Sequence, residues 1–347
     1  MSLHSGDGTL VTASEQELAN TIYNGDCLYV LKGFPGNFVG LVYADPPFFT
    51  ERSFFLGRTA VFSDRWAGGL AEYLNVMYDH FVELRRVMRK DATIYVHCDF
   101  HASHYIKVIL DRVFGYGRFL NEVVWKRQSA HCDAKQGARN FGRIHDVLLV
   151  YTKSEDYVWN QRFVQYAPGY IRKYYRYTEE ETGRRFALGD LTAPGGFGNG
   201  NPKYGFKGVK RYWRYSESRM DALLKEGRIY ISGQGRTPRI KRYLDEMPGI
   251  PLQDIWDDVT SFKHGEKQRY PTQKPLGLLE RILAVSSDCH TLVLDPYCGS
   301  GTTLLAAQLA GRTWIGIDKS KRAVQHSSRR LARAGANPKI RIANGAA

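Results

Sequence analysis

The chain has no long apolar run. No stretch approaches the roughly 18 consecutive apolar residues that a membrane-spanning helix needs, so we expect no membrane partner. The N-terminus has no basic region followed by an apolar segment, and we expect no signal peptide. Cysteine is scarce, with five residues in 347, an odd count and no C-x-x-C spacing. These features favour reduced thiols in a cytosolic compartment over a disulfide framework or a zinc site.

Several chemical signatures are absent as well. The chain contains no Walker-type phosphate loop, so we predict no ATP-driven motor. It has no internal repeat and no low-complexity tract. His97, His101 and His104 lie close together beside Cys98 and Asp99, but the stretch reads more simply as the end of a strand followed by the start of a helix. We therefore predict no metal site.

Acidic residues are in the minority. Lys and Arg number 49 against 35 Asp and Glu, a net charge of +14. Between Arg162 and Asp245 there are 18 Lys or Arg and 8 Asp or Glu, so a net +10 lies in this one segment, where aromatic residues alternate with the cations. A solvated basic face is the alternative interpretation. Clustering in one segment instead favours contact with a polyanion, and interleaved aromatic side chains favour a nucleic acid.

The sequence Asp45-Pro46-Pro47-Phe48 follows an apolar, strand-like run over residues 39–44. An exocyclic amine on adenine or cytosine is a poor nucleophile, because its lone pair is delocalised into the ring. A carboxylate and a free backbone carbonyl aimed at its two N–H bonds would draw the nitrogen towards a tetrahedral geometry. Two prolines stiffen the stretch, and an aromatic side chain can stack on the base. The alternative is a strand ended by proline with an Asp in the turn.

A glycine-rich turn lies near the other end of the chain. An apolar run over residues 291–294 leads into Asp-Pro-Tyr-Cys-Gly-Ser-Gly-Thr at 295–302 and then into a helical pattern. A second apolar run ends at Asp318, 17 residues after Gly301. This is close to the spacing at which an acid meets ribose hydroxyls in a dinucleotide fold. Glycines let the backbone approach a ligand closely, and the strand–turn–helix–strand–acid order is the context that such a motif requires.

Together the two motifs resemble those of the amino-directed DNA methyltransferases that use S-adenosyl-L-methionine. The tetrad precedes the glycine loop, which is the order of the β group of that family. The resemblance runs from about Thr21 to Ile342, almost the whole chain. Further stretches that resemble the family are Asn24–Cys27, Trp213–Tyr215, Gly227–Tyr230, Asp254–Asp258 and Tyr270–Pro275.

The resemblance implies S-adenosyl-L-methionine as cofactor and roles for particular residues. Asp45 and the Pro46 carbonyl would accept hydrogen bonds from the amino group, Pro47 would fix the turn and Phe48 would stack on the base. Residues implied in cofactor contact are Asp26, Lys274, Asp295, Pro296, Cys298, Gly299, Gly301, Thr302 and Asp318. For Lys274, a bond to the cofactor carboxylate and a structural cap are nearly equal alternatives.

Strands that alternate with helices predict a Rossmann-like, doubly wound α/β fold. We expect a mostly parallel, seven-stranded sheet with an antiparallel hairpin formed by residues 122–126 and 146–151. The expected division is a catalytic half over residues 21–159, a target-recognition region over 160–265 and a cofactor-binding half over 266–345.

Double-stranded DNA is the partner that the resemblance implies, and the middle region is the part that would recognise it. Lys and Arg neutralise phosphates and reach guanine edges. The target base would flip out of the stack, because its amino group is otherwise paired. The candidate DNA-binding residues are Lys173, Arg176, Lys207, Lys210, Arg211 and Arg214.

The target base and the class of protein each have alternatives. In the family, Asp at the first place of the tetrad goes mostly with adenine N6, so adenine is our prediction and cytosine N4 the alternative. The chain has no Pro-Cys pair, which argues against carbon-5 methylation through a thiolate adduct. An RNA or a protein glutamine is also compatible with the tetrad, and a DNA-binding regulator without turnover is the alternative of another class. The resemblance also implies a bacterial or archaeal cytoplasm, association with the nucleoid, and a restriction–modification system, with a restriction endonuclease and a homodimer among the expected partners.

Overall fold

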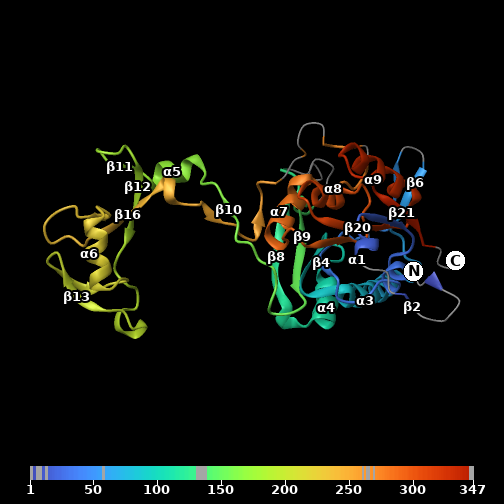
Figure 1. The fold of residues 1–347 in the computed structure, drawn as a ribbon, viewed down its shortest axis with the longest axis horizontal. Helices are drawn as coiled ribbons and strands as arrows, with labels where there is room; N and C mark the ends of the chain where they lie inside the picture. The colour runs from blue at the N-terminus through green and yellow to red at the C-terminus, as the bar shows by residue number, and fades with distance from the viewer. Residues whose placement is uncertain are drawn as a thin grey trace. The chain divides into compact units, whose positions relative to one another are not determined.

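The computed structural model describes residues 3–4, 10–11, 15–56, 59–129, 139–259, 262, 266–268 and 270–343. The chain divides into two compact units (Figure 1). The large unit consists of Met1–Gln161 and Gln253–Ala347, and the small unit is Arg162–Leu252. The assignment of residues 160–265 to target recognition stays a prediction. Residues 253–259 group with the large unit.

A sheet of nine described strands forms the centre of the large unit. In spatial order the strands are β18 (Ile255–Trp256), β8 (Phe119–Lys126), β9 (His145–Thr152), β7 (Met88–Cys98), β4 (Val39–Ala44), β19 (Leu292–Asp295), β20 (Thr313–Asp318), β3 (Thr21–Asn24) and β21 (Lys339–Ile342). Of these nine strands, only β9 runs against the others, because it pairs antiparallel with both β7 and β8. The predicted mostly parallel sheet and its antiparallel hairpin are confirmed.

The sheet has more strands than the seven we predicted. Two strands account for the difference: β18, of two residues, extends one edge beside β8, and β3 lies between β20 and the edge strand β21. Pairing of β18 with β8 joins residues far apart in the chain, such as Ile255 with Val124, which no local pattern reports. All six residues of β4 are buried, as a continuous apolar run predicts for a central parallel strand.

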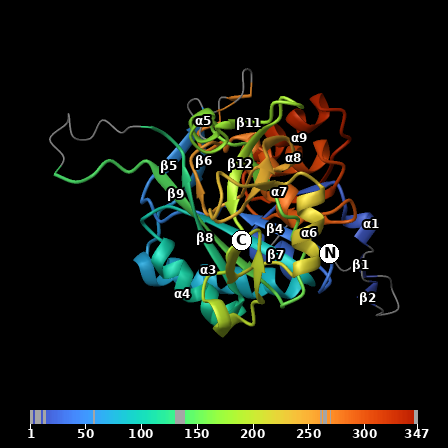
Figure 2. The same ribbon diagram turned by 90° about the vertical axis from the view of Figure 1, so that its left-hand side faces the viewer.

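Helices cover both faces of this sheet. Figures 1 and 2 show α3 and α4 on one side and α7, α8 and α9 on the other. The helices of the large unit are α1 (Glu15–Leu18), α2 (Cys27–Lys32), α3 (Gly69–Val87), α4 (Ser103–Phe114), the 3-10 helix η1 (Tyr116–Arg118), α7 (Leu276–Ser286), α8 (Thr302–Leu309) and α9 (Lys321–Arg333). Short hairpins are formed by β1 (Leu3–His4) with β2 (Leu10–Val11) and by β5 (Ser53–Leu56) with β6 (Thr59–Ser63).

Helix α3 illustrates why the sequence forms this layer. Tyr73, Met77, Phe81 and Leu84 recur at helical spacing and are all buried in the core. These side chains pack with the strands and with α4, so the apolar stripe of α3 faces the sheet. Arg85 and Arg86 lie in its last turn, where cations complement the helix dipole.

The small unit has its own core. Its elements are β10 (Phe163–Val164), α5 (Pro168–Tyr174), β11 (Tyr177–Thr178), β12 (Arg185–Asp190), η3 (Gly196–Asn199), β13 (Lys203–Phe206), β14 (Val209–Tyr212), α6 (Glu217–Lys225), β15 (Ile229–Tyr230), β16 (Arg239–Tyr243), η4 (Leu244–Glu246) and β17 (Ile250–Pro251). A four-stranded antiparallel sheet has the order β11-β12-β16-β15. Trp213 is fully buried against Phe206 and the α6 residues Met220 and Leu223. The unit therefore folds around an aromatic centre, while cations such as Lys207, Lys210 and Arg211 are exposed.

Four neighbouring parallel strands carry an acid at or just beyond their carboxyl ends. Asp45 follows β4, Asp295 ends β19, Asp318 ends β20, and Asp26 lies two residues after β3. Parallel neighbours present their carboxyl ends at one edge, so the four acids lie along that edge. Strand β19 continues through α8 and β4 continues through α3, on opposite faces of the sheet. Ligands in open α/β sheets bind at such a switch point.

Candidate active site

A cavity of about 380 Å³ lies at this edge of the large unit. Its volume falls in the range of about 300–1,000 Å³ that small-molecule sites occupy. Of the thirteen residues predicted for catalysis and cofactor contact, twelve line the cavity: Asp26, Asp45, Pro46, Pro47, Phe48, Lys274, Asp295, Pro296, Cys298, Gly299, Thr302 and Asp318. Gly301 does not line it. Residues separated by almost 300 positions in the sequence therefore meet in one chamber.

Asp45 carries one satisfied and one unsatisfied carboxylate oxygen. Its Oδ2 forms a short ion pair with the Nζ of Lys274. Its Oδ1 is buried and has no hydrogen-bond partner among the described residues. A buried carboxylate oxygen without a donor is costly, so this atom stands ready to accept an N–H from a ligand. The ammonium of Lys274 also lies 5.3 Å from the centre of the Phe48 ring.

The loop after the tetrad is held by Asp64, which lines the same cavity. Its carboxylate accepts the backbone N–H groups of Phe48, Phe49 and Thr50 at 3.2, 3.2 and 2.7 Å, and the Thr50 hydroxyl at 2.7 Å. It also accepts the indole N–H of Trp66 at 2.9 Å. Asp64 is 1% exposed. The sequence did not reveal this residue, because an isolated Asp sixteen positions after Phe48 has no motif around it.

The loop needs such a clamp because its backbone is strained. Phe49 and Glu51 have φ values of 59° and 56°, in the left-handed region that non-glycine residues seldom adopt. A conformation of this kind persists only where the surroundings hold it. The backbone hydrogen bonds to Asp64 supply that hold next to the tetrad.

The two proline carbonyls have different environments. The Pro47 carbonyl accepts a hydrogen bond from the Tyr73 hydroxyl of α3 at 2.8 Å. No described residue donates to the Pro46 carbonyl. Two acceptors beside the cavity, the Asp45 Oδ1 and the Pro46 carbonyl, thus have no donor among the described residues. This is the pair that the sequence predicts for the two N–H bonds of an amino group.

A buried polar chain supports Phe48 from behind. The Phe48 ring stacks on the imidazole of His97, with 5.7 Å between ring centres and 23° between planes. His97 is fully buried and lies between the Tyr43 hydroxyl, 2.8 Å from its Nδ1, and Asp146, 3.2 Å from its Nε2. Burial opposes the charge on Asp146, but the hydrogen bond and charge of His97, with Lys274 and Arg127 nearby, hold its pKa below the ordinary value. His97 therefore belongs to the base of the aromatic platform.

The glycine loop is shaped for close approach. Gly299 has a φ of 45°, and a Cβ there would meet the Tyr270 ring at 3.3 Å. Its N–H donates to Asp318 at 2.9 Å, and the Ser320 N–H donates to the other oxygen at 2.8 Å. Gly301, with a φ of 73°, precedes α8, and a Cβ there would lie 2.6 Å from the Cβ of Ser327. Gly301 thus serves the turn and the packing of α9, while Gly299 borders the cavity.

Comparison with known proteins agrees with this geometry. The family described as DNA methylase, which comprises N6 and N4 methyltransferases, matches residues 39–329. The chain belongs to this DNA methylase family. It is 32% identical over 298 residues to the type II methyltransferase M.EcaI of Enterobacter cloacae, a match over 84% of this chain and 64% of that protein. It is 24% identical over 317 residues to the DNA adenine methyltransferase YhdJ of Escherichia coli K12, a match over 90% of this chain and 83% of that protein.

The fold is shared with solved methylase structures. The crystal structure of TTHA0409 from Thermus thermophilus, complexed with S-adenosyl-L-methionine, covers 94% of this chain and 99% of its own with a TM-score of 0.51 and 18% identity. The chain is shorter than some relatives. It spans 64% of M.EcaI and 50% of the StyLTI Mod subunit, a type III restriction–modification enzyme of Salmonella typhimurium with 26% identity.

Two acids of this cavity, Asp295 and Asp318, resist ionisation. Burial raises the pKa of Asp295 to about 7, with hydrogen bonds from Thr303 and the Tyr297 N–H opposing it and the charges of Asp45 and Asp318 adding to it. Burial likewise raises the pKa of Asp318 to about 6, against its two backbone hydrogen bonds. Crowded carboxylates in a closed pocket favour a cationic ligand, which would relieve their repulsion.

Three cysteines of the large unit, Cys27, Cys98 and Cys298, are buried. Burial raises the pKa values of Cys27, Cys98 and Cys298 far above that of a free thiol, so these side chains are inert packing thiols. Within the described parts of the chain, no three His, Cys, Asp or Glu side chains come together as metal ligands.

Among those same residues no helix combines the length and apolar character needed to cross a membrane.

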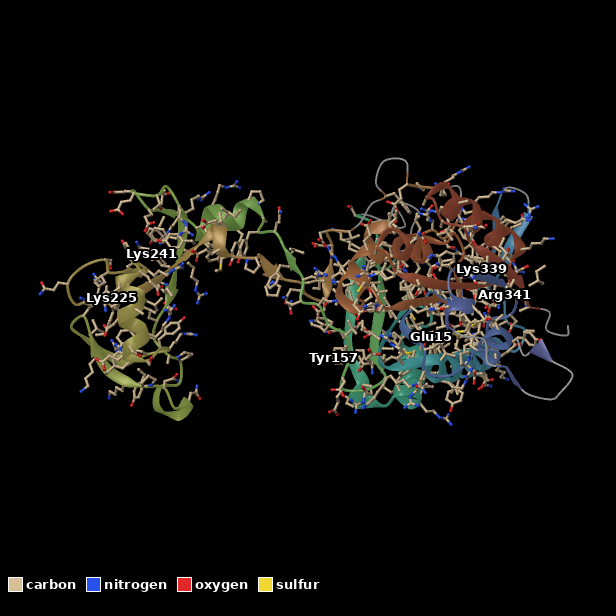
Figure 3. The ribbon with its side chains drawn as sticks, viewed as in Figure 1. Glu15, Tyr157, Lys225, Lys241, Lys339 and Arg341 are labelled. Atoms are coloured by element: carbon tan, nitrogen blue, oxygen red, sulfur yellow. The ribbon has the colours of Figure 1, made fainter. Side chains whose placement is uncertain are left out.

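Cations of the small unit fall into two groups. One group is bound to acids: Arg184 and Arg228 both contact Glu246, and Lys241, labelled in Figure 3, contacts Glu179. The other group contains the six predicted DNA-binding residues, which are all exposed and have no carboxylate partner among the described residues. These six are Lys173, Arg176, Lys207, Lys210, Arg211 and Arg214; further exposed cations such as Arg172 and Lys203 also lack a carboxylate partner among the described residues.

Proposed function

We propose that the protein transfers the methyl group of S-adenosyl-L-methionine to the exocyclic amino group of a base in double-stranded DNA, with adenine N6 as the target. The observation that carries the proposal is a pair of acceptors, Asp45 Oδ1 and the Pro46 carbonyl, that have no donor among the described residues and lie in the same cavity as the glycine loop. Membership of the DNA methylase family and the similarity to YhdJ, a DNA adenine methyltransferase, support it.

The cavity suits the cofactor chemically. S-adenosyl-L-methionine supplies a methyl group on a cationic sulfonium, together with an ammonium, and Asp26, Asp295 and Asp318 line the wall as counter-charges. Asp318 would accept from the ribose hydroxyls, and the absence of a side chain at Gly299 leaves room for close approach. The raised pKa values of Asp295 and Asp318 mean that a cationic ligand would be bound most tightly once both acids are ionised.

Asp45 and Pro46 would prepare the amine. Hydrogen bonds to both N–H groups localise the lone pair on nitrogen, and Phe48 holds the ring plane against its support, His97. The new N–C bond forms as the C–S bond breaks, which leaves the nitrogen cationic. A proton then departs from that nitrogen to Asp45 or water. Orientation of two reactants in one cavity contributes much of the expected acceleration.

The small unit would hold the DNA. The six predicted DNA-binding cations, which have no carboxylate partner among the described residues, can neutralise phosphates without breaking an internal ion pair. The paired cations already stabilise the unit. Tyr166 stacks on Tyr170 at 4.9 Å and Tyr170 packs on Tyr174 at 4.5 Å, so aromatic surface lies beside Lys173. Transfer to a paired base requires that it leave the helix, so base flipping is part of the proposal.

Partners in the cell extend the proposal. Names of type II methyltransferases and a type III restriction–modification subunit among the relatives support a restriction–modification system with a partner endonuclease. A homodimer is a further expectation that rests on the family resemblance. Analytical ultracentrifugation of the purified protein separates a monomer from a dimer.

The first experiment is transfer of labelled methyl groups to unmethylated genomic DNA, followed by mass spectrometry of the digested nucleosides. N6-methyladenine supports the proposal, and N4-methylcytosine keeps the mechanism while correcting the base. DNA and cofactor binding without any methylated nucleoside would overturn it in favour of a regulator without turnover or another acceptor. Asp45→Ala is the control, because it removes the proposed acceptor and leaves the small unit intact.

A further inference from the structure

Lys274 lies where the target base would be recognised. The sequence left a bond to the cofactor carboxylate and a structural cap as alternatives for its ammonium. In the structure its Nζ pairs with Asp45 Oδ2 and lies over the Phe48 ring at 5.3 Å. Its side chain is 13% exposed. The two residues that it contacts are those proposed to bind the amino group and the plane of the base. The contacts with Asp45 and Phe48 position this ammonium without a contribution from the cofactor.

The chain around Lys274 fixes its backbone. The Gln273 side chain accepts from the Gln268 N–H at 2.7 Å and donates to the Glu266 carbonyl at 3.0 Å. On the other side, the Leu276 N–H donates to the Glu266 carboxylate, and Pro275 is the N-cap residue of α7. Hydrogen bonds therefore hold the chain on both sides of Lys274, and its side chain lines the cavity and contacts Asp45.

Hydrogen-bond capacity shows what this lysine can still do. An ammonium has three N–H donors, and the hydrogen bond to Asp45 Oδ2 uses one of them. Asp45 Oδ1 remains without a partner among the described residues. Asp45 and Lys274 thus form an acceptor beside a donor. Adenine presents the complement on its Watson–Crick edge, an N6 amino donor beside the N1 acceptor, and cytosine does so with N4 and N3. Guanine presents donors at both N1 and N2 on that edge, which the ammonium would repel.

We propose that Lys274 is a specificity-determining residue that donates a hydrogen bond to the ring nitrogen next to the reacting amino group, N1 in adenine. This inference rests on the proposed function, since it concerns the same site. Flipped bases are commonly read on their Watson–Crick edge. A charged donor that finds no acceptor in a closed site loses its hydrogen bond, so removal of N1 should cost about 10- to 100-fold in kcat/KM.

The test is a double-mutant cycle between the protein and the base. A duplex that carries the methylated site, once mapped, is made with adenine, 1-deazaadenine or 7-deazaadenine at the target position, and kcat/KM is measured for the parent and for Lys274→Met. The parent should lose about 10- to 100-fold on 1-deazaadenine and less than about 3-fold on 7-deazaadenine. Lys274→Met should show no further loss on 1-deazaadenine, because the intrinsic reactivity of the analogue cancels between the two proteins.

Several results would overturn the inference. If the parent enzyme methylates 1-deazaadenine as efficiently as adenine, that result alone refutes the N1 contact, even if Lys274→Met does not fold. A full 1-deazaadenine penalty in Lys274→Met, or a loss confined to the KM of the cofactor, would assign the lysine to another role. Lys274→Arg, which keeps a donor, should retain the discrimination. Failure of the parent to methylate the adenine duplex would instead refute the proposed function. If the product is N4-methylcytosine, 3-deazacytosine replaces 1-deazaadenine.

Discussion

The cavity of the large unit and the cationic surface of the small unit use charge in opposite ways. In the cavity, charges are buried and acids such as Asp64 and Asp318 are each held by several fixed donors. On the small unit, Lys207, Lys210 and Arg211 are exposed and have no carboxylate partner among the described residues. Buried charge gives orientation, because the protein itself satisfies it. Exposed charge gives attraction that water and salt weaken. The two regions should therefore respond to different experiments.

The largest effect is expected at Asp45. Replacement by Ala removes the carboxylate that accepts the amino N–H, so kcat should fall by about 10²- to 10³-fold. DNA affinity should stay within about 3-fold, because the small unit is unchanged. Single-turnover methyl transfer and a DNA-binding titration measure the two quantities. Undiminished transfer by Asp45→Ala would refute the catalytic assignment.

The next largest effect is expected at Asp64, which holds the loop after the tetrad. Asp64→Ala leaves the N–H groups of Phe48, Phe49 and Thr50 without their acceptor, and should lower the free energy of unfolding by about 2–4 kcal/mol. Because the strained loop then relaxes, kcat should also fall while DNA affinity does not. Chemical denaturation and transfer kinetics check these expectations. Asp156→Ala is the control: that side chain is 87% exposed, and its loss should change neither quantity.

A smaller effect is expected from the exposed cations. Lys210→Ala with Arg211→Ala should reduce the salt dependence of DNA binding by about 2 units of slope, one for each phosphate that the variant no longer neutralises. Arg184→Ala is the matched control, because Arg184 already pairs with Asp245 and Glu246. That variant should weaken the small unit and leave the salt slope unchanged. Equal slopes for parent and double variant would place the DNA contacts elsewhere.

The smallest effect is a pH dependence of cofactor affinity. Since the pKa of Asp295 is about 7 and that of Asp318 about 6, the ionised forms that attract a cation are lost as pH falls from 8 to 6, and affinity should drop by about tenfold. The stability of the unliganded protein should change in the opposite direction and increase as pH falls. The pKa of Asp295 in the folded protein lies above its ordinary value of 3.8, so this group stabilises the folded state at low pH. That stabilisation is lost as pH rises through about 7. Calorimetric titration and thermal unfolding across this range measure both trends, and Asp295→Asn should flatten both.

Local patterns predicted the elements whose residues are neighbours in the chain. The boundaries of β4 and the existence of the β8–β9 hairpin follow from runs of apolar residues. The role of Asp64 and the contact of Lys274 with Asp45 were not anticipated, because both depend on folding of distant segments onto the tetrad. Lys274 lies 229 positions from Asp45. His97 was considered only as a metal ligand and rejected, and its position under Phe48 was not anticipated.

The sequence alone determined the chemistry that the protein has available: an acid and a proline carbonyl in a stiff tetrad, a glycine turn followed by an acid, and a basic segment rich in aromatics. These features depend on residue types and on short separations along the chain, which can be read directly from the sequence. Only the tertiary structure decided which acceptors stay free, which cations are already paired and what faces Asp45 across the cavity. Such outcomes depend on which groups burial brings together, and burial is a property of the folded chain.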